Sequence, residues 1–221
     1  MPQTTAQNLD DVWQAIDEQR ASLADLLGDL SEREWETPSL CKGWRVREVA
    51  AHLTLSHATV PAVAWAMIRA RGSFDRMVRD TARRRARLPV EAYAQILRAM
   101  VGSRRKAPGV TPLEPLIDVL VHGQDITIPL HRNRPVPPRA AALAADRVWP
   151  NLFPFRAGRR LAGIRFTATD CDWSAGEGVT VEGPMGAILL VLTGRPAGTA
   201  QLSGPGLPLL MSRLPAPGPP E

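Results

Sequence analysis

The sequence of 221 residues predicts an α+β protein, with an N-terminal bundle of four or five helices followed by a small α/β domain. Two observations support this prediction. Up to about residue 150, apolar residues recur at intervals of three and four, which is the spacing of amphipathic helices. From about residue 155, β-branched residues and glycines become typical of short strands. We expect the bundle over 1–153, the α/β domain over 154–214 and a flexible, proline-rich tail over 215–221.

The helices of the bundle are predicted from their apolar stripes and from the turn residues between them. The first is expected over 9–29. The second is expected over 45–71, with a kink or a restart at Pro61, because proline disrupts the interior of a helix. An arginine-rich segment occupies 73–87. Three more helices are expected over 89–103, 113–130 and 138–149. Their short connections favour antiparallel packing.

The C-terminal domain is predicted to alternate strands with a helix. Strands are expected over 161–170 and 178–183. A helix should begin at Pro184 and end at Gly194, the positions that helices prefer for these two residue types. A last strand is expected over 199–204, followed by a short apolar segment over 207–214.

The composition is that of an ordinary globular protein, with a net charge of +5 that is carried almost entirely by arginine. No stretch of 18 apolar residues occurs, and the N-terminus lacks the features of a signal peptide, so we expect a cytoplasmic protein with no membrane partner. Cys41 and Cys171 are far apart and are interpreted as reduced thiols without a catalytic role.

The arginines at 76–87 leave a nucleic-acid-binding protein as one alternative. We interpret them as a solvated helix face and expect no nucleic-acid partner. Aromatic residues make up only 5% of the chain and do not interleave with the arginines, as they would in a single-strand binder. No known DNA- or RNA-binding motif is present.

The segment 113–130 contains the residues that best indicate chemistry. It is apolar almost all round, as a buried helix would be, yet it contains Asp118, His122 and Asp125. Asp118 and His122 are four residues apart and therefore share one face. A buried, unpaired carboxylate costs several kcal/mol. If they are buried, these side chains either pair with one another or hold a cation, and the alternative is a polar stripe that faces solvent.

His52 is the candidate for a third ligand, because it lies on the apolar side of its predicted helix. A local Glu48/His52 pair is a competing site, His57 should point elsewhere, and His131 is expected at the surface. Two histidines and a carboxylate suit zinc with an open fourth position. Nickel, cobalt or iron would also fit, because affinity alone does not select the metal. Asp125 could orient His122 through a hydrogen bond to its ring, without binding the metal itself.

Three motifs together resemble a known family. GWRVREVAAHL at 43–53 is similar to the first histidine segment of the DinB/YfiT-like metal-binding bundles. LIDVLVHGQDI at 116–126 and the stretch at 166–195 resemble the mycothiol-dependent maleylpyruvate isomerase branch of that superfamily. The resemblance implies a divalent metal, usually zinc, on His52, Asp118 and His122. It also implies mycothiol as a cofactor, bound to the metal as its thiolate.

The resemblance further implies an enzyme, an isomerase or an S-transferase, whose thiolate adds to a small electrophilic substrate. Arg195 best matches a family arginine that binds the acidic substrate or the thiol, and so would be catalytic and cofactor-binding. Its alternative is an ordinary basic residue at a helix C-terminus. The family often has glutamate where this chain has Asp118. A non-catalytic metal- and thiol-binding or regulatory module remains an alternative, and both a monomer and a homodimer fit.

Overall fold

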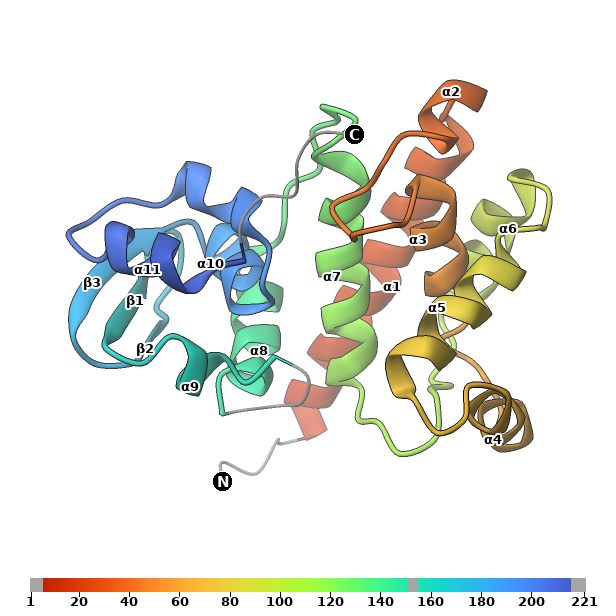
Figure 1. The fold of residues 1–221 in the computed structure, drawn as a ribbon, viewed down its shortest axis with the longest axis horizontal. Helices are drawn as coiled ribbons and strands as arrows, with labels where there is room; N and C mark the ends of the chain where they lie inside the picture. Colours follow the sequence, from red (N-terminus) through yellow and green to blue (C-terminus); the bar gives the residue numbers. More distant parts are fainter. Residues whose placement is uncertain (1–5, 151–154, 216–221) are drawn as a thin grey trace. The chain divides into compact units, whose positions relative to one another are not determined.

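The computed structural model describes residues 6–150 and 155–215 and confirms the α+β class, with helices throughout and one small sheet (Figure 1). The chain forms two compact units that divide between Asn133 and Arg134. The helix predicted over 138–149 therefore lies in the second unit rather than in the bundle. The expected boundary at 153/154 and residues 216–221 of the expected tail lie outside the described residues.

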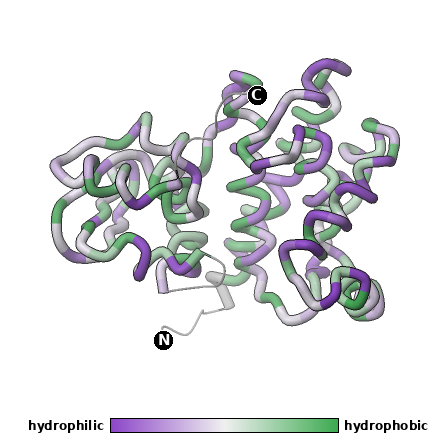
Figure 2. Tube along the Cα trace, in the orientation of Figure 1, coloured by the Kyte–Doolittle hydropathy of each residue, from purple (hydrophilic) through white to green (hydrophobic). Residues whose placement is uncertain are grey.

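The first unit is helical and its centre is α7. Its elements in order are α1 (Ala6–Gly28), α2 (Glu32–Trp35), α3 (Val46–Leu53), α4 (Val60–Arg69), α5 (Phe74–Arg85), α6 (Glu91–Ala99) and α7 (Leu113–Thr127). α7 packs against both α1 and α3, while α1 also contacts α6 and α3 contacts α5. Hydrophobic and hydrophilic residues alternate along α7 (Figure 2). The packing of α3 on α7 brings two distant parts of the sequence together.

The segment predicted as one helix from 45 to 71 is two helices, with the restart at Pro61 confirmed. α3 ends at Leu53, where the Thr54 hydroxyl donates a 2.7 Å hydrogen bond to the carbonyl of Ala51. α4 begins at Val60 and has Pro61 in its first turn. Proline is tolerated there because its missing N–H would have no partner within the helix.

The second unit combines helices with a three-stranded sheet. Its elements are α8 (Pro138–Val148), α9 (Ala157–Arg160), β1 (Ile164–Ala168), β2 (Ser174–Ala175), β3 (Val179–Gly183), α10 (Met185–Leu192), the 3-10 helix η1 (Pro196–Gln201) and α11 (Leu207–Arg213). The strand order is β2-β1-β3, antiparallel between β1 and β2 and parallel between β1 and β3. α10 packs on α8 and η1 and is apolar along almost its whole length.

The strand predicted over 199–204 is wrong. Residues up to Gln201 form η1, and only Ser203 makes an isolated bridge, to Glu182. Gly198 explains the helical turn, because it packs so closely on α10 that an added Cβ would lie 2.5 Å from the carbonyl oxygen of Ala187. The close approach to α10 therefore outweighs the strand-like residue pattern.

Within 6–150 and 155–215, no helix is both long and apolar enough to cross a membrane.

The first turn of α3 is held by a charged pair whose strength should depend on pH. The backbone N–H of Arg45 donates to Glu48 over 2.8 Å, and its guanidinium donates to the same carboxylate over 2.6 Å. Burial acts to raise the pKa of Glu48, but the hydrogen bonds and charge of Arg45 outweigh it and lower the pKa. Because the pKa of Glu48 is lower in the folded than in the unfolded protein, the charged carboxylate stabilises the fold at pH values above its unfolded pKa. This stabilisation is lost as the pH falls through its folded pKa.

We expect Glu48→Gln to lower the free energy of unfolding by about 1–2 kcal/mol at neutral pH, because a capping interaction and an ion pair weaken. The difference from the wild type should shrink at an acidic pH below the unfolded pKa of a glutamate, because the stabilisation by the charged carboxylate is lost as the pH falls from there through the folded pKa. Urea unfolding at both pH values measures it. Glu32→Gln, at an exposed position, is the control. An equal loss at both pH values would contradict this origin of the stability.

Candidate metal centre

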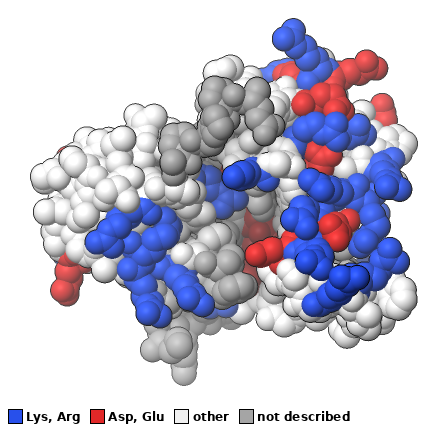
Figure 3. Space-filling model, in the orientation of Figure 1, with Lys and Arg blue, Asp and Glu red and all other residues white. Residues whose placement is uncertain are grey.

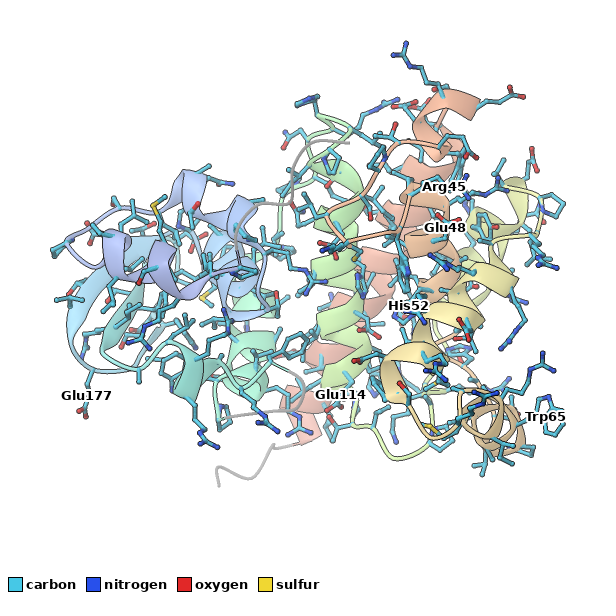
Figure 4. The ribbon with its side chains drawn as sticks, in the orientation of Figure 1. Arg45, Glu48, His52, Trp65, Glu114 and Glu177 are labelled. Carbon is cyan, nitrogen blue, oxygen red and sulfur yellow. The ribbon has the colours of Figure 1, made fainter. Side chains whose placement is uncertain are left out.

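The three predicted ligands come together where α3 packs on α7. His52 lies in the last turn of α3, and Asp118 and His122 lie one turn apart on α7. One potential ligand atom from each residue lies within 4.8 Å of the other two. Figure 4 labels His52 on α3, beside α7. A cation of the size of Zn²⁺ binds nitrogen and oxygen at about 2.0–2.2 Å, so donors this close can share one ion after small side-chain movements.

A second group of potential ligands shares His122. It consists of Cys41, His122 and Asp125, whose ligand atoms also lie within 4.8 Å of one another. Nδ1 of His122 lies 2.8 Å from Oδ2 of Asp125, and the Cys41 thiol donates to the same oxygen over 3.1 Å. The side chain of Asp125 is fully buried. The expected contact between Asp125 and His122 is thus present, with Cys41 as an additional neighbour.

The two groups occupy different sides of the His122 ring. Since Nδ1 faces the Asp125 carboxylate, Nε2 is the nitrogen left for a cation held with His52 and Asp118. A carboxylate behind a metal-binding histidine fixes both the tautomer and the ring orientation. This arrangement is compatible with Asp125 and Cys41 supporting His122 while His52 and Asp118 remain the candidate ligands.

The environment of His122 favours a positive charge in the absence of a cation. Burial acts to lower the pKa of His122, but the Cys41 sulfur and the Asp125 carboxylate outweigh it and raise the pKa to about 10. At neutral pH the ring would then carry a proton on each nitrogen. A metal ion must displace one of these protons, so metal binding should release a proton and strengthen as the pH rises.

The ring of His52 is held by aromatic contacts. The Trp44 ring lies 5.5 Å from it between centroids, and the His122 ring lies 5.0 Å away in an edge-on arrangement. Trp44 follows the turn at Gly43, which adopts a positive φ of 74° that favours glycine. This turn positions Trp44 just before α3 begins.

The other histidines and Glu48 belong to neither group. The competing Glu48/His52 pair is not formed, because the Glu48 carboxylate is bound by Arg45 at the other end of α3. His57 lies beyond the end of α3, and burial together with the charges of Arg20 and Arg105 lowers its pKa. His131 is exposed, as predicted.

Arg195 lies in the second unit, directly after α10. α10 ends at Leu192 and is followed by Gly194, whose φ of 85° is the left-handed conformation found after many helices, and the N–H of Arg195 donates to the carbonyl of Leu190. Its guanidinium Nη1 donates to the carbonyl of Thr193 over 2.8 Å, so the side chain helps to close the helix. The role expected for Arg195 toward a substrate or thiol stays a prediction.

Cys41 is the neighbour of the site that sequence reasoning missed. It lies 81 residues before His122 and 84 before Asp125, in the loop that precedes α3. This loop is tied to α7 by the N–H of Leu40, which donates to the carbonyl of Asp125 over 3.1 Å. No local pattern reveals such a contact. The only hint in the sequence is that Cys41 lies two residues before the motif at 43–53 that contains His52.

Comparison with known proteins agrees with the motifs found in the sequence. Residues 16–115 match the family model of the mycothiol maleylpyruvate isomerase N-terminal domain. The match contains His52 and ends just before Asp118 and His122. No curated protein matches the sequence.

Two solved structures resemble this chain over 96% of its length and of theirs. One is the mycothiol-dependent maleylpyruvate isomerase, with a TM-score of 0.58 and 13% sequence identity. The other is a variant of a mycothiol-dependent maleylpyruvate isomerase in which one histidine is replaced by alanine, with a TM-score of 0.57 and 15% identity. At these identities the likeness is one of fold. The family match covers residues 16–115, so the chain is similar to the mycothiol maleylpyruvate isomerase family in that part of its sequence, and to the solved isomerase in its fold.

Proposed function

We propose that this chain is a metal-dependent enzyme that uses a low-molecular-weight thiol, mycothiol, to isomerise a small electrophilic substrate of the maleylpyruvate type. One observation carries the proposal: donor atoms of His52, Asp118 and His122 lie within 4.8 Å of one another in a chain whose residues 16–115 match the family model. The activity of the structural relative, a maleylpyruvate isomerase, supports the choice of reaction.

The donor set fits a divalent metal. Two imidazoles and one carboxylate match the three protein ligands of catalytic zinc sites, which keep a fourth position open. Nickel is the alternative, since nitrogen and oxygen donors bind it as well. When bound, the metal would supply positive charge that lowers the pKa of a coordinated thiol and so provides a nucleophile at neutral pH.

The residues of the chain hold this centre in shape. Asp125 accepts a hydrogen bond from Nδ1 of His122 and so directs Nε2 of the ring toward His52 and Asp118. The Cys41 thiol donates to the same Asp125 oxygen and limits its rotation. Asp118 contributes a negative charge that offsets part of the charge of the cation. Trp44 packs against the ring of His52.

We also propose that Arg195 binds a carboxylate of the substrate or of the thiol. A guanidinium suits this task because its donors match the two oxygens of a carboxylate. Arg195→Gln would then raise KM more than it lowers kcat, whereas a purely structural role at the end of α10 would appear as a loss of stability. The cytoplasmic location, the absence of a nucleic-acid partner and the choice between monomer and homodimer stay predictions.

Two other functions share the same centre. An S-transferase would release the thiol adduct as its product, whereas an isomerase regenerates the thiol. A non-catalytic metal- and thiol-binding or regulatory module would bind both and turn over nothing. The donor set supports all three functions. The fold shared with the isomerase over 96% of both chains favours an isomerase.

The test is turnover of maleylpyruvate by the purified protein with and without mycothiol. We expect thiol-dependent isomerisation that is lost after chelation and restored by Zn²⁺ or Ni²⁺, with no net consumption of thiol. Mass spectrometry distinguishes an S-transferase by an accumulating adduct. Binding of metal and thiol without turnover of maleylpyruvate or a panel of related electrophiles would contradict the enzymatic proposal and leave a binding module.

A further inference from the structure

The first unit exposes an apolar stripe along α4. Val60, Trp65 and Ile68 have exposed fractions of 64%, 61% and 69%. The spacing of Pro61, Ala64, Trp65 and Ile68 follows one face of a helix, and all four are exposed. Ala66 and Ala70 are buried on the other side, where α4 packs on α5. Figure 4 shows Trp65 pointing away from the other helices.

Arginines gather directly beside this stripe. Arg69 from α4 lines one hollow of about 380 Å³ together with Arg83, Arg84 and Arg87 from α5 and the turn after it. Asp80 also lines it, but its carboxylate lies 3.7 Å from Arg79. Within the described ranges, the side chains of these four lining arginines form no ion pair or hydrogen bond. Figure 3 shows the dense positive charge on this side of the first unit.

The basic surface continues into a second hollow of about 700 Å³ near the start of α3. Arg83 and Arg87 line it as well, together with Arg45 and Arg47. The last two are already paired with Glu36, so the free positive charge lies on the side of α4 and α5. Neither hollow is lined by His52, Asp118 or His122. This surface is therefore separate from the candidate metal centre.

We propose that α4 and the neighbouring arginines of α5 bind the surface of an anionic lipid bilayer. Such a surface offers phosphate oxygens for the arginines and, directly beneath them, an apolar layer for Val60 and Ile68. Tryptophan favours the boundary between these two layers, because its ring is apolar and its N–H is polar. The helix would lie in the plane of the surface, and the rest of the chain would remain in water.

The charges disfavour two other occupants. A second copy of the chain in a two-fold arrangement would place the same arginines opposite one another. A nucleic acid would supply phosphates but no apolar layer for the aliphatic residues of α4. The sequence predicted no membrane partner because no segment is long enough to span a bilayer. Length does not limit a helix that lies on the surface, so the exposed stripe revises that expectation.

The test is flotation of the full-length protein with vesicles of phosphatidylcholine alone and of phosphatidylcholine with phosphatidylglycerol. We expect binding to the anionic vesicles, weakened about tenfold or more by Arg83→Glu/Arg84→Glu and by Trp65→Ser/Ile68→Ser. Met211→Ser and Arg33→Glu, at exposed positions elsewhere, should bind like the wild type. Circular dichroism checks that each variant is folded.

The fluorescence of Trp65 provides a second measurement of vesicle binding. Trp13, Trp35 and Trp173 are buried, Trp44 and Trp149 are partly buried, and Trp65 is 61% exposed, so a blue shift on adding anionic vesicles should come mainly from Trp65 and disappear in Trp65→Phe. Failure of the wild type to float with anionic vesicles would overturn the proposal, as would floating that both double variants retain. Preferential binding to duplex DNA over vesicles would instead favour a nucleic-acid partner and would also overturn it.

Discussion

Asp118→Asn is expected to reduce both the bound metal and the thiol-dependent rate to background. Asp118 is the one carboxylate in the group formed with His52 and His122. Asparagine keeps the size of the side chain but removes its negative charge, and an amide is a far weaker ligand for Zn²⁺ than a carboxylate. Metal content after dialysis and the initial rate with mycothiol measure the two effects on the same preparation.

Asp118→Glu is the matched control for this variant. Glutamate restores the charge and adds one methylene. We expect it to retain metal and a measurable rate. If Asp118→Asn held metal as firmly as Asp118→Glu does, the carboxylate would not be a ligand, and the cation would have to be held by other residues.

Asp125→Ala is expected to lower the metal affinity by about 10–100-fold, although Asp125 does not face the proposed cation. Its carboxylate lies 2.8 Å from Nδ1 of His122 and is fully buried. Without it, the His122 ring loses the partner that fixes its tautomer and its orientation. Competition with a chromogenic chelator measures the affinity, and it should be done at several pH values.

The pH series separates the role of Asp125 from simple loss of structure. Asp125 contributes to the raised pKa of His122, so its removal should lower that pKa and weaken the competition between protons and the metal. The loss of affinity in Asp125→Ala should therefore be largest at high pH and become smaller as the pH falls. Cys41→Ser keeps a donor next to Asp125 but removes the sulfur that also raises the pKa of His122, so its pH dependence should shift in the same direction while the Asp125 contact is kept. Equal affinity in Asp125→Ala and the wild type at every pH would contradict the supporting role.

The grouping of Asp118 with His122 could be predicted because it depends only on residues that are close together in the sequence. Asp118 and His122 are four residues apart on a helix that is apolar almost all round, and this spacing alone places them on one face. His52 could be identified as a polar residue on an apolar helix side. That α3 and α7 pack together was supplied by the family resemblance, since spacing within one helix says nothing about its neighbour.

The contact with Cys41 could not be predicted, because it depends on how a loop before α3 docks on α7 more than 80 residues away. The wrong strand at 199–204 has a similar origin. Its residues suit a strand, but the close packing of Gly198 on α10 decides the backbone. The alanine-rich helix α8 was predicted correctly as a helix. Its small side chains do not indicate which element the helix packs against, and the structure shows that this element is α10.

The most direct test of the metal centre is elemental analysis of the untagged protein, purified without added metal, beside His122→Ala and His131→Ala. His122 is shared by both groups of potential ligands, whereas His131 is exposed and belongs to neither. We predict about one equivalent of zinc or nickel in the wild type and in His131→Ala, and almost none in His122→Ala. Absence of metal from all three folded proteins, or equal metal in all three, would contradict the proposed centre.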